Sequence, residues 1–128
     1  MKRTEAIDLD AIAPESIPGV RLLPVIHDRV DMASVVRGVL SELNPAAVAV
    51  ELPTTLRDGV LKAVRRLPKI SVVISEQPGE EAVVWTCSPG EPFAEAMRWA
   101  GEREKPLYFI DPDVAYKGRH ADPVPDPQ

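Results

Sequence analysis

Ionisable side chains stand at the carboxyl ends of the predicted strands, and their types suit general acid–base or metal chemistry. The residues at these positions are His27 and Asp28, then Glu51, Glu76 and Asp111. In an open α/β sheet, ligands bind beyond the carboxyl ends of parallel strands, and neighbouring strands lie about 5 Å apart. A histidine and several carboxylates gathered there have the donor atoms that a divalent metal or a general acid–base pair requires.

His27 and Glu51 are the strongest candidates among these residues. A histidine directly after a buried strand is not needed for packing, and Glu51 ends an apolar run with a charge that burial would penalise unless it were paired. We therefore predict a catalytic or metal-binding role for both. The alternative for any of these groups is simple solvation, because strands end where the chain meets water.

Asp28, Arg29 and Asp111 are predicted to bind substrate or another ligand at the same edge. Asp28 has helix capping as an alternative role, since a helix is expected to follow it. Arg29 follows the first strand and is placed to meet an anionic ligand, with surface solvation as its alternative. Cys87 ends a strand, and we interpret it as a small buried apolar residue rather than a nucleophile.

Common nucleotide-binding and esterase motifs are absent from the sequence. The first strand is followed by His-Asp-Arg-Val-Asp, so neither GxGxxG nor a P-loop is present, and no serine stands in GxSxG. The 128 residues carry a net charge of -5 and only 5% aromatic residues. Without a basic stripe or a stacking platform, we expect no nucleic-acid partner.

The location expected from the sequence is the cytoplasm. One cysteine excludes an internal disulfide and fits a reducing compartment. The N-terminus has no apolar stretch of the signal-peptide kind, and the longest wholly apolar run, residues 46–50, is far too short to span a membrane.

Hydrophobic spacing predicts alternating strands and helices. The predicted strands cover residues 20–27, 46–52, 70–75, 82–87 and 107–111. The predicted helices lie between residues 32 and 43 with Asp31 as N-cap, between 53 and 67, and between 92 and 105. The two strands on either side of the turn at residues 77–80 form a hairpin, whereas Pro24 is awkward inside the first strand because it lacks an N–H.

This order predicts an α/β fold, a Rossmann-like three-layer sandwich with a mostly parallel sheet of about five strands and one antiparallel hairpin strand. The α/β domain is expected over residues 20–113. Residues 1–19 are expected to form an N-terminal leader and residues 114–128 a proline-rich tail or linker.

Four segments in this order resemble the N-terminal part of the TraB/PrgY/GumN–Tiki superfamily, whose wider group includes erythromycin-esterase-like and ChaN-like proteins. The segments are Pro24-Val-Ile-His27, Asn44-Pro-Ala-Ala-Val-Ala-Val-Glu-Leu52, Pro92-Phe-Ala-Glu-Ala-Met-Arg-Trp-Ala100 and Pro106-Leu-Tyr-Phe-Ile-Asp111. They fall within residues 20–113. Their order and spacing, rather than any single motif, carry the resemblance.

The resemblance implies a metal-assisted or general-base hydrolase. His27 matches the histidine of the family's GxxH motif, Glu51 matches the glutamate after the second strand, and Asp111 matches the end of the Phe-Ile-Asp strand. By this resemblance, Glu51 would activate water and His27 would serve as base or ligand. The implied cofactor is a divalent metal, Mn, Zn or Co, held by His27 and Glu51.

Two departures from the family pattern leave a second function open. Pro24 replaces the GxxH glycine, and His120 lacks the preceding strand that a second GxxH half would need. Three explanations are open: the chain is a fragment, a homodimer or partner domain completes the site, or activity is lost. The alternative function is a non-catalytic half-fold that binds a protein or a small ligand.

Overall fold

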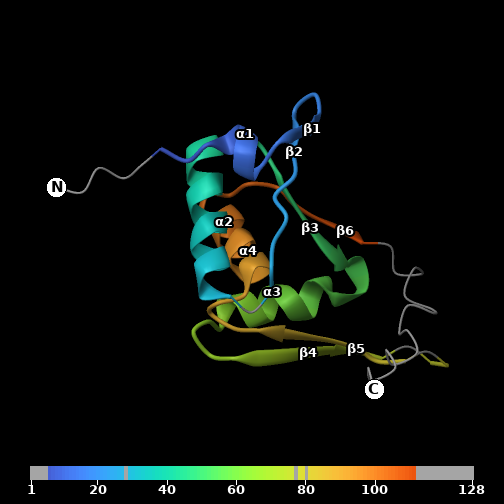
Figure 1. The fold of residues 1–128 in the computed structure, drawn as a ribbon. Coiled ribbons are helices and arrows are strands. Elements are labelled where there is room, and N and C mark those ends of the chain that lie inside the picture. The colour runs from blue at the N-terminus through green and yellow to red at the C-terminus, as the bar shows by residue number, and fades with distance from the viewer. Residues whose placement is uncertain (1–5, 28, 77, 80, 112–128) are drawn as a thin grey trace, which may run out of the picture.

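The computed structural model describes residues 6–27, 29–76, 78–79 and 81–111 and shows a mixed α/β protein (Figure 1). In chain order, the elements are α1 Leu9–Ile12, β1 Glu15–Ile17, β2 Val20–Arg21, α2 Val30–Leu43, β3 Val48–Pro53, a 3-10 turn Thr54–Leu56, α3 Arg57–Arg65, β4 Ser71–Ser75, β5 Val83–Cys87, α4 Pro92–Glu102 and β6 Leu107–Asp111. The three long predicted helices and the last four predicted strands all form, with shifts of a few residues at their ends.

Local chemistry explains the C-terminal end of α2. Asn44 adopts the left-handed conformation at the C-cap, with φ 45°, and its N–H bonds to the Leu40 carbonyl at 2.8 Å. Pro45 follows, and the residue before a proline avoids the helical region. The prediction that Asp31 is the N-cap is wrong, because Arg29 holds that position and Asp31 lies in the first turn. A hydrogen bond from Arg29 lowers the pKa of the Asp31 carboxyl.

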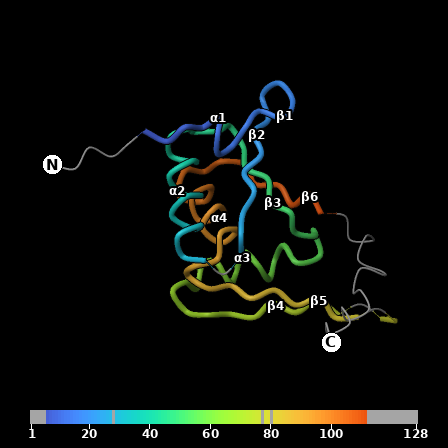
Figure 2. Tube along the Cα trace, in the orientation of Figure 1, coloured from blue at the N-terminus to red at the C-terminus, as the bar shows by residue number. Residues whose placement is uncertain are grey.

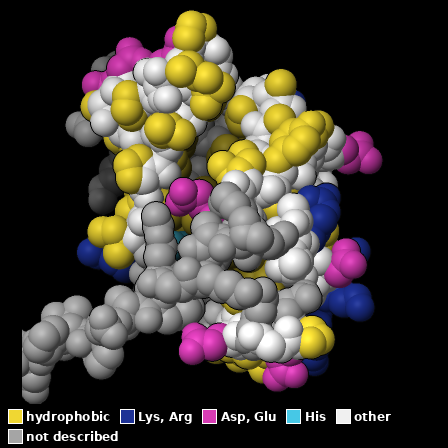
Figure 3. All heavy atoms as spheres, turned by 90° about the vertical axis from the view of Figure 1, so that its right-hand side faces the viewer, with side chains coloured by type: hydrophobic (Ala, Val, Ile, Leu, Met, Phe, Trp, Pro, Cys, Tyr) yellow, Lys and Arg dark blue, Asp and Glu magenta, His cyan; other side chains and the backbone are white. Residues whose placement is uncertain are grey.

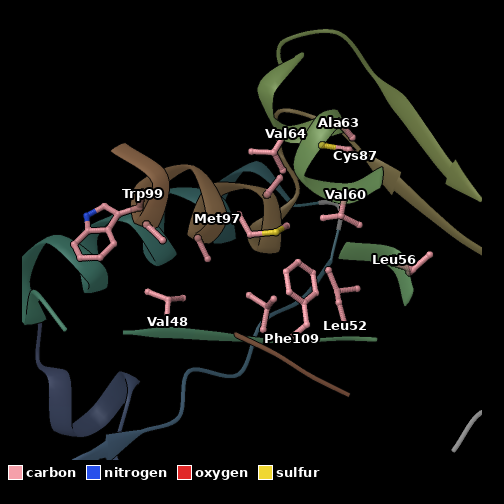
Figure 4. Close-up of a cluster of buried hydrophobic side chains, with 14 of the residues drawn as sticks. Val48, Leu52, Leu56, Val60, Ala63, Val64, Cys87, Met97, Trp99 and Phe109 are labelled. Carbon is pink, nitrogen blue, oxygen red and sulfur yellow. The ribbon is translucent and has the colours of Figure 1, made fainter. Parts of the chain in front are cut away.

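The helices α2 and α4 pack side by side (Figure 2). Ion pairs between their side chains also join them. Arg37 donates to Glu95 at 2.6 Å and to Glu102 at 2.7 Å. Beneath these pairs lies the core, where Trp99 and Met97 of α4 meet β3 and β6 (Figure 4). The side chains of Trp99, Leu56, Val60 and Cys87 are almost fully buried. Removal of this apolar surface from water is the main stabilising contribution to such a core.

The strands pair in three separate ladders of two strands each among the described residues. The β3–β6 pair is parallel, with Val48 opposite Leu107 and Val50 opposite Phe109. The β4–β5 pair is antiparallel over five residue pairs, which confirms the predicted hairpin. The third ladder joins β1 to β2, so part of the predicted leader is itself ordered structure.

The single sheet of about five strands is not confirmed. Of the predicted first strand, only Val20 and Arg21 lie in a strand, and they pair with β1 instead of β3. Residues 22–27 run as one extended connection from β2 toward α2 (Figure 2). Leu23 and Val25 pack against the core, whereas Leu22, Pro24 and Ile26 are exposed, an alternation typical of a strand. Pro24 in the middle cannot donate a ladder hydrogen bond.

No helix within the described residues is long and apolar enough to cross a membrane.

The contact between α3 and β4 generates a prediction about Gly59. Replacing a helix-interior glycine by alanine usually stabilises a protein by about 0.5–1 kcal/mol. A Cβ at Gly59, however, would lie 2.6 Å from Cγ1 of the buried Val73. Overpacking of this kind typically costs about 1–3 kcal/mol. We therefore expect Gly59→Ala to lower the free energy of unfolding, measured by urea denaturation.

Gly101→Ala is the matched control, since a Cβ built at Gly101 in α4 would meet no described atom within 4 Å beyond its chain neighbours and the nearby backbone of its own helix. We expect this variant to be as stable as the wild type or slightly more stable. Equal gains in stability from both substitutions would contradict the close packing of α3 on β4.

Candidate functional site

A cleft of about 520 Å³ lies where four parts of the chain meet: the end of the run before α2, the end of β3, the strand β5 and the start of α4. The residues that line it are His27, Glu51, Leu52, Pro53, Leu56, Ala82, Val83, Val84, Trp85, Thr86, Glu91 and Phe93. The fold thus brings His27 and Glu51, the two strongest candidates, to one cleft. Five consecutive residues of β5 and its approach form a wall of this cleft.

His27 is held in place by a buried carboxylate. Its Nδ1 atom lies 2.5 Å from Oε1 of Glu91, whose side chain is only 2% exposed, while the histidine side chain is 52% exposed. An ionised carboxylate can only accept hydrogen bonds, so it pairs with the tautomer that carries the proton on Nδ1. In the neutral imidazole this leaves the lone pair on Nε2. The Phe93 ring also contacts the imidazole edge to face, with ring centroids 4.7 Å apart.

Glu91 is buried because it begins a helix. It is the N-cap residue of α4, and its Oε2 atom accepts the N–H of Ala94 at 3.0 Å, with Pro92 at the first helical position. The positive end of the helix dipole and this N–H offset part of the cost of burying a carboxylate. Sequence analysis did not identify Glu91 as a site residue. Its position directly before Pro92 was the one local signal, and glutamate is not a typical N-cap.

Glu51 reaches the cleft from the face of β3 that points away from the core. Val50 and Leu52 are buried on either side of it, whereas Glu51 itself is exposed, as the alternation of side chains along a strand requires. The expected penalty for burying this charge therefore does not arise. Substitution of this exposed carboxylate should therefore leave the packing of the core against β3 unchanged.

The other predicted site residues are distributed differently. Asp28 lies outside the described residues. Arg29 donates two hydrogen bonds to the nearby carboxylate of Asp31, at 2.7 and 3.0 Å. Asp111 ends β6 and lies opposite Pro53 in the ladder register. Within the part of the chain that the structure describes, neither Arg29 nor Asp111 is among the residues that line the cleft.

The donor set for a metal is small. Residues 6–27, 29–76, 78–79 and 81–111 contain no group of three or more His, Cys, Asp or Glu side chains arranged to hold an ion. His27 and Glu51 supply two donors at the cleft, whereas catalytic zinc sites usually use three protein ligands.

Cys87 lies in the core close to the buried carboxylate. Its side chain is fully buried, which confirms the interpretation as a small apolar residue. Burial raises the pKa of the thiol to about 11, and the negative charge of Glu91 adds to the shift. The thiol is therefore neutral at ordinary pH and poorly suited to nucleophilic chemistry.

Comparison with known proteins leaves the family resemblance untested. No family model matches the chain, and neither a curated protein nor a solved structure matches it.

The double role of Glu91 generates a prediction. Glu91→Ala removes both the cap on α4 and the partner of His27. Loss of a cap costs about 0.5–2 kcal/mol, and loss of a hydrogen bond to a charged group about 1.5–3 kcal/mol. We expect Glu91→Ala to lower the free energy of unfolding by about 2 kcal/mol or more in urea denaturation. Hydrogen exchange at the Ala94 amide should become faster.

Glu91→Gln is the matched variant, because its side-chain oxygen can still accept from the Ala94 N–H. It should keep slow exchange at Ala94 and lose less stability than Glu91→Ala. If Glu91→Ala proved as stable as the wild type, the buried carboxylate would not hold the start of α4.

Proposed function

We propose that the cleft is the active site of a hydrolase similar to the TraB/Tiki/erythromycin-esterase group. The observation that carries this proposal is the pairing of His27 with the buried Glu91 at a cleft that Glu51 also lines. A histidine oriented by a buried carboxylate is the arrangement that general-base catalysis uses in many hydrolases. The exposed Glu51 adds a second ionisable group at the same place.

In this proposal, Nε2 of His27 accepts a proton from a water molecule as the water oxygen attacks the carbonyl carbon of an ester or amide. Glu91 fixes the tautomer of the imidazole and stabilises the imidazolium that forms. Glu51 accepts a hydrogen bond from the same water and orients it. His27 then returns the proton to the leaving group when the bond between it and the carbonyl carbon breaks.

A divalent ion, Mn, Zn or Co, is a separate part of the proposal. Nε2 of His27 and the carboxylate of Glu51 are the described residues that would hold it, since Nδ1 is already engaged by Glu91. Such an ion would supply Lewis-acid activation of the carbonyl group or of water. The mechanism above does not depend on it.

We also propose that the ladders belong to one Rossmann-like three-layer sandwich with about five strands. The parallel β3–β6 pair and the strand-like burial of residues 22–26 support this. The cleft supports it as well, because the end of the segment 22–27 and the end of β3 both line it. The carboxyl ends of neighbouring strands meet in this way in an open parallel sheet. The location proposed is the cytoplasm, on the strength of the single buried cysteine.

A non-catalytic binding module is the second candidate function. It is favoured by the apolar residues that the strands leave in solvent. Hydrophobic side chains are numerous on the upper half of the face drawn in Figure 3. Separately, the large hydrophobic residues exposed on β1, β2 and β6 include Ile17, Val20, Tyr108 and Ile110. Exposed apolar surface of this kind often marks a binding site for a partner. In this reading, a partner protein or partner domain covers these strands.

Glu51→Ala tests the hydrolase proposal most cleanly. Glu51 is exposed, so the variant should fold like the wild type, as judged by circular dichroism and thermal melting. We expect its kcat/KM on a panel of aryl esters and short peptides to fall about 100-fold, the scale on which misplacing a reacting group slows an enzyme. Turnover that stays the same would exclude a catalytic role for Glu51.

Glu42→Ala is the matched control, since Glu42 is an exposed glutamate on α2 that does not line the cleft. It should keep full activity on every substrate of the panel. The same panel is applied to His27→Ala. Loss of activity in both Glu51→Ala and His27→Ala supports a joint site, whereas unchanged activity in both favours the binding module.

The metal part is tested by calorimetric titration of the purified chain with Mn²⁺, Zn²⁺ and Co²⁺. We expect one binding site per chain in the wild type and its loss in His27→Ala and Glu51→Ala. Binding that survives in both variants would place the ion elsewhere. No binding in the wild type would leave His27 as a metal-independent base.

A further inference from the structure

The outer edge of β4 is an unprotected strand edge. Within the described residues β4 pairs with β5 alone, and its five register pairs run without a bulge. Between Lys69 and Glu76 the sequence is Ile-Ser-Val-Val-Ile-Ser, with neither charge nor proline. Proteins usually block open strand edges with charged residues, prolines and bulges. An edge that lacks them is a template for pairing with another strand.

Apolar side chains accompany this edge on the solvent face of the hairpin. Ile70, Val72 and Ile74 are between 57 and 69% exposed, and Val84 of β5 is opposite Ile74 in the register. The other face of β4 is different, because Val73 is buried against α3. The outward apolar residues therefore do not pack against the described part of the chain.

Charge is arranged with opposite signs at the two ends of the hairpin. Lys69 is exposed just before its base, Arg66 is exposed at the C-cap of α3 three residues earlier, and Glu76 and Glu81 are exposed at its tip. At about 3.3 Å per residue the two ends lie roughly 20 Å apart, more than the Debye length of about 8 Å at physiological salt. Each end therefore interacts chiefly with whatever charge lies directly across the edge. A parallel neighbour of the same sequence would place like charges together, whereas an antiparallel one would place opposite charges together.

We propose that a second copy of this chain docks on the β4 edge in antiparallel fashion, so that the two hairpins form one four-stranded sheet. A strand that meets its own copy antiparallel gives a closed twofold dimer, the commonest oligomer symmetry. The basic base of each hairpin then faces the acidic tip of the other. Opposite charges across strands stabilise such pairing, and like charges oppose it.

The proposed interface leaves the cleft accessible. The cleft is lined by β5 and its approach, and β4 does not contribute to it. Dimer formation and hydrolysis are therefore independent, and either proposal can fail without the other.

Sedimentation velocity of the full chain over a wide concentration range tests the dimer. We expect a monomer–dimer equilibrium in the wild type. Two double variants each reverse the charge at one end of the hairpin. Arg66→Glu with Lys69→Glu changes the base, and Glu76→Lys with Glu81→Lys changes the tip. Each should weaken self-association about tenfold or more. The variant with all four changes carries complementary ends again, so it should recover the dimer.

Val72→Lys and Tyr108→Lys form the matched pair that locates the interface. Val72 on β4 and Tyr108 on β6 are 57 and 56% exposed, so both variants should fold, as circular dichroism would confirm. We expect Val72→Lys to weaken the dimer and Tyr108→Lys to leave it unchanged. A strict monomer at all concentrations, the reverse response of this pair, or failure of the fourfold variant to recover the dimer would each overturn the proposal.

Discussion

The buried carboxylate of Glu91 ties together the parts of the chain that form the cleft. An ionised group with so little exposure is costly in a protein interior unless charged or polar partners surround it. Here one oxygen accepts the N–H of Ala94 at the start of α4, and the other meets His27 at the end of the extended run. The same interaction thus sets where α4 begins and where His27 stands. Because each partner depends on the other, loss of Glu91 disturbs both the helix and the site.

Because Glu91 fixes the start of α4, it also affects the contacts that α4 makes with the core and with α2. Below its first turn, α4 carries Met97 and Trp99 into the core against β3 and β6, and its outer flank pairs with Arg37 of α2. The position of β3 in turn determines which way Glu51 faces. Its buried neighbours Val50 and Leu52 turn toward α4, so Glu51 must turn away from the core.

The strands present two different kinds of open surface. On the side of β5 the backbone borders a cleft that contains ionisable groups, a place suited to a small ligand. On the side of β4 the edge is apolar and regular, with charge only at its ends, a place suited to another strand. A two-stranded hairpin is marginally stable by itself, so both its packing on α3 and any strand added at its edge contribute to its order.

The sequence by itself determined the local elements, because their signals lie within a few residues. Asn44 before Pro45 ends α2, and a turn between two apolar runs makes the β4–β5 hairpin. It also indicated that His27 and Glu51 belong at one edge, since both follow apolar runs. Tertiary structure alone decided that Glu91, 64 residues away along the chain, holds His27. It also decided that the strands pair in separate ladders. Contacts between distant segments depend on which surfaces of the elements pack together, and the spacing of residues along the sequence does not contain that information.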